Sequence, residues 1–396
     1  MTLHALRTDA RHTLYASYLA IISQAVVNNF VPLLLLTFER EFKVSLSQIA
    51  VLVGFNFLVQ LTTDFVAAFV VDRVGYRKSL VFGQFCSFLG LVGLAVLPGI
   101  LPQPFIGLLL SVTLYAIGGG MCEVLVSPVV EHSPTEKKAA AMSLLHSFYC
   151  WGHVYVVLAS SAFFLVFGIR SWRFLAILWA LLPLADALYF TQVPITQPPA
   201  QPGMHGALKM FRQPVFWLLF FLMVCSGACE QSVSQWASAF AESGLKVSKT
   251  VGDLAGPTFF AVMMGLSRVM HAKHAERYAL RKVMLASGFL CIAGYLMVIL
   301  SPVPLFAFLG VGITGFSVGV FWPGTLSLAP GKLPGGGTAM YALLALAGDV
   351  GCSAGPSLVG FVSEGFGGAL TAGFAAALVF PLGLVGLLAY VKKVRA

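Results

Sequence analysis

The sequence predicts an all-helical integral membrane protein with twelve transmembrane helices in two pseudo-symmetric six-helix halves. Of its 396 residues, 58% are hydrophobic and only 10% are charged, and the mean hydropathy is +0.89. Soluble globular chains carry about 25% charged residues. Apolar runs of about 20 residues recur along the chain, as helices that cross a hydrocarbon core of about 30 Å require. A barrel would instead show short strands of alternating polarity.

The predicted spans are twelve apolar stretches separated by charged, glycine-rich or proline-rich segments. They lie at residues 14–38, 48–71, 79–97, 105–130, 139–167, 174–193, 214–240, 253–272, 281–300, 305–328, 338–361 and 368–390. With their loops these spans account for the whole chain, so we expect no soluble catalytic domain. No small-residue cleavage site interrupts the first span, and we expect no removable signal peptide.

The formal net charge of +9 is a topology signal rather than a sign of nucleic-acid binding. If both termini lie on one side of the membrane, that side carries 18 of the 24 lysines and arginines, and the other side carries six. By the positive-inside rule both termini are then cytoplasmic. The expected location is a plasma membrane of the bacterial inner-membrane type, with the lipid bilayer as surroundings and no nucleic-acid partner.

A proline-rich stretch at the middle of the chain predicts a linker between the two halves. Residues 194–203 contain four prolines, and Lys209 and Arg212 follow. Proline and glycine in such density favour a loop over a helix. The expected organisation is an N-terminal half at 1–193, a cytoplasmic linker at 194–213 and a C-terminal half at 214–396.

Local features that recur at a similar offset indicate that the two halves are repeats. The segment DRVGYRK at 72–78 and the segment ERYALRK at 276–282 are 204 residues apart and share the acid, both arginines and the lysine. Each follows a predicted span, the second and the eighth. An Ala-Met pair at 141–142, which opens the fifth span, recurs at 339–340, which opens the eleventh.

The segment 72–78 is similar to the loop motif between helices two and three of the major facilitator superfamily of secondary transporters. The resemblance extends over essentially the whole chain, although Ala68 stands where that motif usually has a glycine. The resemblance implies a fold in which helices 1, 2, 4, 5, 7, 8, 10 and 11 line a central cavity and helices 3, 6, 9 and 12 face lipid. It also implies transport by alternating access.

Within the superfamily, parts of the first half resemble the fucose permease-type sugar:proton symporters. The similar parts are the segments 118–128 and 145–152 and the pair Asn28-Asn29. Pro32 occupies the place at which some members of that subfamily carry a membrane-embedded aspartate. The resemblance implies a sugar or sugar derivative as substrate and protons as the coupling ion.

The charges of the two loop segments predict a conformational latch at the cytoplasmic ends of the helices. Such charges can pair when the inner face closes and separate when the halves move. Pairs worth about 1–2 kcal/mol are enough to bias two conformers. The same charges also serve positive-inside anchoring. The predicted latch residues are Asp72, Arg73, Arg77, Glu276, Arg277 and Arg281.

Five acids lie well inside predicted spans, where each charge costs about 2.5–3.5 kcal/mol. Glu123 is the first candidate for proton coupling, because it follows a Gly-Gly-Gly stretch in an apolar span and burial favours its neutral form. In fucose permease-like proteins the matching position takes part in substrate binding and proton coupling. A purely structural acid is the alternative interpretation. We expect Asp186, on a lipid-facing helix, to snorkel outward without a function, and Asp349 to have a structural or gating role.

Polar residues at helical spacing predict walls of the cavity on spans two, five and seven. On span two the stripe runs at i, i+4 and i+8, and on span five at i, i+3 and i+7. Histidines on such a stripe can relay protons, although a buried neutral histidine is the commoner case. Trp322 can stack on a sugar ring or serve only as packing. The remaining predicted solute- and proton-coupling residues are Asn28, Asn29, Asn56, Gln60, Asp64, His146, Tyr149, His153, Glu230, Gln231 and Gln235.

The function predicted from these features is proton-coupled symport of a small polar solute, with a sugar or sugar derivative favoured. The alternative is a proton-driven exporter of drugs or metabolites with the same fold. A membrane receptor or scaffold that transports nothing is the third possibility, but it gives no reason for the buried acids. The chain has no Walker loop and no HExxH motif, so we expect no enzyme activity. We expect no cofactor and no metal, and a monomer whose partners are a small-molecule solute and protons.

Overall fold

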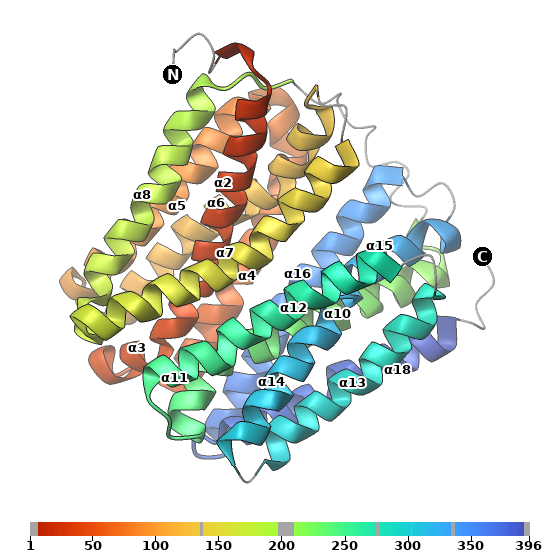
Figure 1. Ribbon diagram of the computed structural model, residues 1–396. Coiled ribbons are helices and arrows are strands. Elements are labelled where there is room, and N and C mark those ends of the chain that lie inside the picture. Colours follow the sequence, from red (N-terminus) through yellow and green to blue (C-terminus); the bar gives the residue numbers. More distant parts are fainter. Residues whose placement is uncertain are drawn as a thin grey trace. The chain divides into compact units, whose positions relative to one another are not determined.

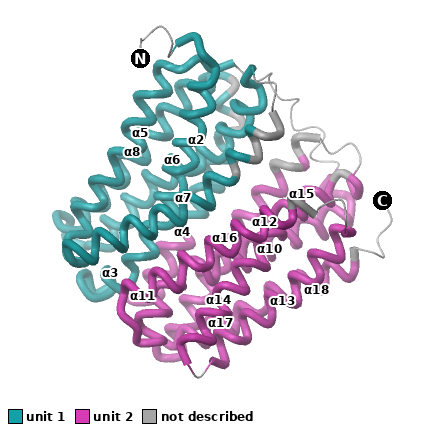
Figure 2. The backbone as a smooth tube through the Cα atoms, in the orientation of Figure 1, with its two compact units in different colours: residues 1–44, 55–200 teal, residues 45–54, 201–396 magenta. Residues whose placement is uncertain are grey.

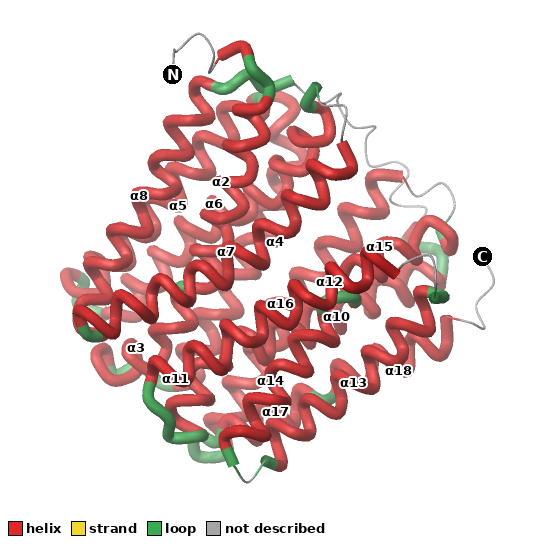
Figure 3. Tube along the Cα trace, viewed as in Figure 1, coloured by secondary structure: helices red, strands yellow, loops and turns green. Residues whose placement is uncertain are grey.

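All of the regular structure in the described part of the chain is helical. The computed structural model describes residues 7–134, 138–196, 210–274, 278–301, 303–333 and 337–391, and no strand occurs among them (Figure 3). Eleven helical stretches in this part are long and apolar enough to cross a membrane. These findings confirm the prediction of an all-helical integral membrane protein.

The chain divides into two compact units, which are coloured separately in Figure 2. The first consists of residues 1–44 and 55–200, and the second of residues 45–54 and 201–396. Most of the predicted linker, residues 197–209, lies outside the described residues. Residues 45–54 group with the second unit, and Ser353 Oγ of that unit donates a hydrogen bond of 2.8 Å to the carbonyl oxygen of Gly54.

The helices follow one another with short connections, as Figure 1 shows. From Arg11 to Gln192 the order is α2 (Arg11–Asn29), the 3₁₀ turn η1 (Val31–Leu34), α3 (Leu35–Phe42), α4 (Leu46–Val74), α5 (Tyr76–Ile100), α6 (Pro104–His132), α7 (Lys138–Phe167), η2 (Ile169–Ser171) and α8 (Trp172–Gln192). From Pro214 it is α10 (Pro214–Ala239), the π turn η3 (Phe240–Gly244), α11 (Lys249–Asp253), the π turn η4 (Leu254–Thr258), α12 (Phe259–His274), α13 (Leu280–Leu300), α14 (Pro304–Val318), α15 (Phe321–Lys332), α16 (Gly337–Gly365), α17 (Leu370–Ala377) and α18 (Val379–Val391).

Prolines and one glycine explain several helix boundaries. Pro104, Pro214 and Pro304 stand in the first turn of α6, α10 and α14, where the missing N–H costs nothing. Between α4 and α5, Gly75 has φ +92° and ψ 145°, a conformation that a residue with a Cβ rarely adopts. The glycine of the 72–78 motif therefore makes the tight turn that connects two transmembrane helices.

The eighth predicted span, 253–272, is helical throughout, but its helix type changes at a proline. Pro257 has no N–H for the helical ladder, and the chain forms the π turn η4 around it before α12 begins. A proline inside a helix breaks or kinks it in this way. The regular helix that remains, α12, has 16 residues. Residues 249–274 are not among the eleven stretches that are long and apolar enough to cross a membrane, where twelve spans were predicted.

Large apolar side chains are exposed on the helices that the resemblance assigns to lipid. On α5, Phe82, Phe85 and Leu89 are exposed, and on α13 Phe289 and Leu300 are exposed. Exposed apolar patches of this extent indicate a protein or membrane contact in any chain. In a chain with eleven membrane-length helices the contact is with the hydrocarbon core.

Close packing in the first unit depends on the glycines at 118–120. A Cβ atom on Gly118 would lie 2.8 Å from the backbone nitrogen of Ser87 and nearer still to the carbonyl oxygen of Gly83. Such a distance is too short for a carbon atom, so α5 and α6 approach each other at a place where only glycine fits. Small residues allow this kind of approach in membrane helices.

We expect Gly118→Ala to lower the free energy of unfolding by about 1–3 kcal/mol, because the new methyl group meets backbone atoms that cannot move separately. Thermal unfolding of the purified protein in detergent measures this change. Gly99→Ala on α5 is the matched control, because a Cβ there meets nothing within 4 Å. An equal stability of the two variants would contradict the packing role of Gly118.

Candidate functional site

A hub of amide side chains connects α2, α4 and α7 in the first unit. The side-chain oxygen of Asn28 accepts hydrogen bonds from Gln60 Nε2 at 2.8 Å and from Asn56 Nδ2 at 3.2 Å. Its amide nitrogen donates to Tyr149 Oη at 3.5 Å. The predicted stripe on the second span and the predicted asparagine on the first therefore meet at one point.

The acid predicted to couple protons lies one helical turn from this hub. Gln24 Nε2 donates a hydrogen bond of 2.8 Å to Glu123 Oε2. Gln24 and Asn28 are four residues apart on α2 and so share one face of that helix. Gln24 is buried and Glu123 is half-buried. A carboxyl group and an amide hub therefore stand side by side along α2.

The glycines of α6 make room for the side chains of α4. A Cβ on Gly119 would lie 3.2 Å from Gln60 Oε1, and one on Gly120 would lie 2.8 Å from Asp64 Oδ1. Asp64 is buried at the next turn of α4 below Gln60. The Gly-Gly-Gly stretch thus serves two neighbours, since Gly118 faces α5 while the next two glycines face the polar stripe of α4.

Other predicted residues of the first unit lie near this network without joining it. Asn29 Nδ2 donates to the carbonyl oxygen of Ala25 on its own helix at 2.9 Å. His153 is buried on α7, one turn beyond Tyr149. The side chain of His146 lies outside the part of the chain that the structure describes.

The second unit contains a ladder of polar side chains along α10 that ends in an ion pair. Gln235 Nε2 donates to Gln231 Oε1 at 2.9 Å, and Gln231 Nε2 donates to Glu230 Oε1 at 3.2 Å. The other oxygen of Glu230 lies 3.9 Å from Arg268 Nη2 on α12. The side chain of Arg268 is 27% exposed and that of Glu230 is 11% exposed. The charge of Glu230 is therefore balanced by a cation inside its own unit.

Two tryptophans of the second unit, of which Trp322 was considered as a ligand contact, have packing partners. Trp236 is fully buried, and its indole N–H donates to the carbonyl oxygen of Pro356 at 3.0 Å. Trp322 on α15 packs its ring against Gly348 of α16, where a Cβ would lie 3.0 Å from the ring atom Cζ2. Trp322 also joins an apolar cluster of the second unit.

The repeated loop motifs make the same contact in each unit. Arg77 Nη1 donates to the carbonyl oxygens of Phe190 and Thr191 at the end of α8, both at 2.9 Å. Arg281 donates to the carbonyl oxygens of Leu388 and Ala389 in α18, at 2.8 and 3.3 Å. A cation at the last turn of a helix satisfies free carbonyls and complements the helix dipole.

Of the other predicted latch residues, only Arg73 has a side chain among the described residues. It is exposed at the end of α4. The side chain of Asp72, and Glu276 and Arg277 entirely, lie outside the described residues.

Three polar residues differ from the sequence-based expectation. Gln24 and Arg268 were not predicted as site residues, although each contacts a predicted acid. Asp186 was expected to snorkel outward, and this expectation is wrong, because Asp186 is 0% exposed. It belongs to the inward-facing stripe of α8, in which Pro183, Ala187 and Phe190 are also buried.

Several other kinds of site find no support in the described residues. No group of three His, Cys, Asp or Glu side chains in them gathers to hold a metal ion. The strings 315–319 and 351–355 read Gly-x-Ser-x-Gly, but their serines, Ser317 and Ser353, lie within the helices α14 and α16. A nucleophile elbow requires a strand that turns into a helix, so neither serine is in that setting.

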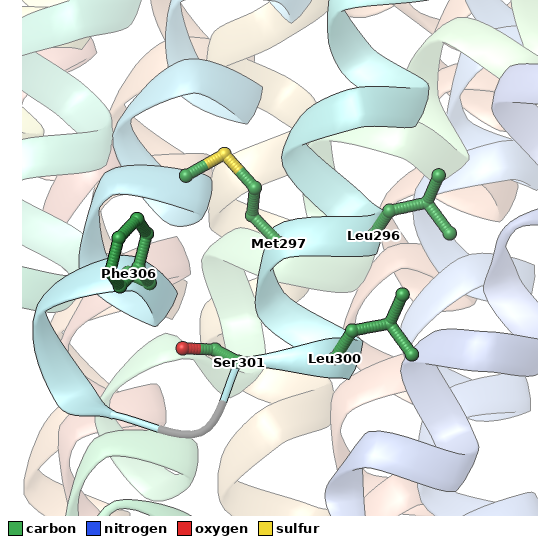
Figure 4. Close-up of a pocket in the computed structure, with 5 residues that line it drawn as sticks. All are labelled: Leu296, Met297, Leu300, Ser301 and Phe306. Carbon is green, nitrogen blue, oxygen red and sulfur yellow. The ribbon is translucent and has the colours of Figure 1, made fainter.

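A surface hollow between α13 and α14 is apolar. Its lining residues are Leu296, Met297, Leu300, Ser301 and Phe306, of which Met297 and Phe306 lie toward each other in Figure 4. The hydroxyl of Ser301 is already bonded to the carbonyl oxygen of Val303 at 2.6 Å. This hollow has no set of polar groups with which to bind a hydrophilic solute.

Comparison with known proteins gives a consistent result. The model of the Major Facilitator Superfamily matches residues 16–272. No curated protein matches the chain. Among solved structures, a D-xylose–proton symporter is similar at a TM-score of 0.77 and 15% identity, covering 97% of this chain and 96% of the other. A nucleoside transporter is similar at a TM-score of 0.77 and 14% identity, covering 97% of this chain and 100% of the other. The fucose:proton symporter of E. coli is similar at a TM-score of 0.66 and 16% identity, covering 98% of this chain and 99% of the other.

Proposed function

The chain belongs to the major facilitator superfamily, and we propose that it carries a small polar solute, a sugar or sugar derivative, in symport with protons. The observation that carries this proposal is the hydrogen bond of 2.8 Å from Gln24 to Glu123, one helical turn from the amide hub of Asn28. A group that binds a proton and groups that bind hydroxyls then share one helix face. The fucose permease-type assignment is part of the same proposal.

The proton-carrying role of Glu123 follows from two opposing effects on its carboxyl group. Apolar surroundings favour the neutral acid, while the N–H of Gln24 favours the carboxylate. A carrier needs a group that takes up a proton on one side of the membrane and releases it on the other, and we assign this role to Glu123.

The solute-binding role of the amide hub follows from its donors and acceptors. Each amide has two N–H donors and an oxygen that can accept two bonds, and the side-chain oxygen of Asn56 has no hydrogen-bond partner among the described residues. Sugar symporters among the similar structures support a polyhydroxylated solute. The other residues that we include in the solute- and proton-coupling set are Asn29, Asp64, His146, Tyr149, His153, Glu230, Gln231, Gln235 and Trp322.

The latch remains part of the proposal. Arg77 and Arg281 hold their loops against the last helix of their own unit. We propose that the neighbouring charges Asp72, Arg73, Glu276 and Arg277 form pairs that change during transport. The proposed orientation has both termini in the cytoplasm, and the proposed location is a bacterial inner membrane, in which the chain works as a monomer.

Proteoliposomes loaded with a pH-sensitive dye test the transport mode and the solute together. Hexoses, deoxy-sugars, sugar acids and nucleosides are added outside in separate runs, and lipophilic cations form another set. We expect one sugar class to acidify the interior of the vesicles. Alkalinisation by lipophilic cations, with no response to any sugar, would instead indicate a proton-driven exporter. A solute that is bound but moves neither itself nor protons across the membrane would contradict transport altogether.

A further inference from the structure

Arg268 is a cation inside a predicted span, and its charged group is turned away from the nearer end of its helix. Helix α12 ends at His274, and Met264 lies one turn before Arg268, further from that end. The guanidinium Nη2 contacts Met264 Sδ at 3.8 Å and lies 3.9 Å from Glu230 Oε2 on α10. A side chain that only marked topology would extend its charge toward the helix end and water. Arg268 instead carries its charge toward a buried stretch of α10.

The sequence places no second cation with Arg268 in most of the predicted spans of the C-terminal half. Five of the six spans contain this arginine and no other lysine or arginine. These spans are 214–240, 253–272, 305–328, 338–361 and 368–390. A charged side chain inside a membrane marks a solute or ion pathway in many carriers. The side chain of Arg268 is 27% exposed, so part of it is accessible to a ligand.

The ion pair between Arg268 and Glu230 is long. Its distance of 3.9 Å exceeds the length of about 2.7–2.9 Å that is typical of a charge-assisted hydrogen bond. The other carboxylate oxygen, Glu230 Oε1, accepts a hydrogen bond from Gln231 Nε2 at 3.2 Å. An arginine fork fits both oxygens of one carboxylate in a bidentate pair. A ligand carboxylate that presents both oxygens to Arg268 would therefore bind it more strongly than Glu230 does.

Amide groups that suit hydroxyls continue from this ion pair along α10. Gln231 and Gln235 are buried, and Gln235 Nε2 donates to Gln231 Oε1 at 2.9 Å. Side-chain amides both donate to and accept from hydroxyl groups. One guanidinium balances one negative charge, which suits a monocarboxylate better than a phosphate group with a charge near −2. The second unit thus combines an anion-binding group with groups that bind hydroxyls.

We propose that Arg268 binds the carboxylate of an acidic solute, a sugar acid, and that Glu230 is the partner of Arg268 while no solute is bound. This inference rests on the proposed function, because it narrows the polar solute to one that carries a carboxylate. The carboxylate of the solute replaces Glu230 at the guanidinium, and the hydroxyls of the solute bind to Gln231 and Gln235. Glu230 then competes with the solute for Arg268.

Ligand binding to the purified full-length protein in detergent tests this inference without measuring transport. The probes are D-glucuronate, D-galacturonate and D-gluconate, and each is compared with its amide, which has nearly the same shape but no charge. Isothermal titration calorimetry measures the affinities. We expect at least one acid to bind about 10- to 100-fold more tightly than its amide. The proposal is overturned if no acid binds, or if every acid binds no better than its amide.

Two variants with a neutral residue at position 230 isolate the contribution of Arg268. Glu230→Gln is expected to bind the acid more tightly than the wild type, because the competing carboxylate is gone. The double variant Glu230→Gln with Arg268→Gln leaves neither charge without its partner, so it should still bind the amide but lose the preference for the acid. Weaker acid binding by Glu230→Gln would contradict the competition. A preference for the acid that survives in the double variant would overturn the role of Arg268.

Arg212→Gln is the matched control, because Arg212 is exposed in the same unit, just before α10. We expect the control to keep the wild-type preference for the acid. An equal loss there would overturn the proposal, since the preference would then come from the overall positive charge. Proteoliposomes that carry a neutral sugar with protons, from a protein that binds no acid, would overturn this inference and leave the proposed function intact. Acid binding without any transport would support the site and contradict the proposed function.

Discussion

Glu123→Gln is expected to abolish accumulation of the solute against its gradient while leaving solute exchange between the two sides of the vesicle membrane. The glutamine amide cannot carry a proton, but it has nearly the same size as the acid. It can still pair with Gln24, which in the wild type donates a hydrogen bond of 2.8 Å to Glu123. Proton uptake and solute uptake then separate, because solute binding persists at the amide hub. The measurement compares dye-reported proton flux with radiolabelled solute accumulation in the same proteoliposomes.

Glu131→Gln is the matched control for this experiment. Glu131 lies in the last turn of the same helix, α6, and is exposed, so the same substitution there removes a charge without touching the network. We expect wild-type accumulation from the control. Normal uphill accumulation by Glu123→Gln would remove this residue from proton coupling, and loss of exchange as well as accumulation would make it a solute-binding residue instead.

The helices and the polar stripes could be predicted from sequence because each depends on residues close together in the chain. Apolar length fixes a span, and a period of four places Asn56 and Gln60 on one face. The change of helix type in the eighth predicted span also has a local cause. Pro257 stands only five residues into the predicted eighth span, and a proline at such a position is a recognised sign of a kink or an end.

The partners of the acids could not be predicted in the same way, because they depend on how the helices are rotated against each other. Gln24 is one of several polar residues on the first span, and only the packing of α2 on α6 selects it for Glu123. Arg268 was counted only among the basic residues that indicate the topology. Its place inside the predicted span 253–272 could have indicated that it pairs with an acid. Asp186 sits in an otherwise apolar stripe, and that stripe packs inward.

Arg268→Ala is expected to be the most destabilising single change at the polar sites of the second unit. Glu230 would keep its charge with only the amide of Gln231 as a described hydrogen-bond donor. Removing one partner of a fully buried ion pair costs about 3–5 kcal/mol, and an exposed pair contributes about 0–1 kcal/mol. With Arg268 27% exposed, we expect a loss of about 2 kcal/mol in the free energy of unfolding.

The double variant Glu230→Gln with Arg268→Ala distinguishes the ion pair from simple loss of packing. If the cost of Arg268→Ala comes from the uncompensated carboxylate, neutralising Glu230 should restore most of the stability, and the two changes should be strongly non-additive. Arg212→Ala is the control, since Arg212 is exposed in the same unit and a surface change of this kind stays within about 0.5 kcal/mol. Additive losses in the double variant would mean that Arg268 supports α12 by its aliphatic stem and that Glu230 is neutral without it.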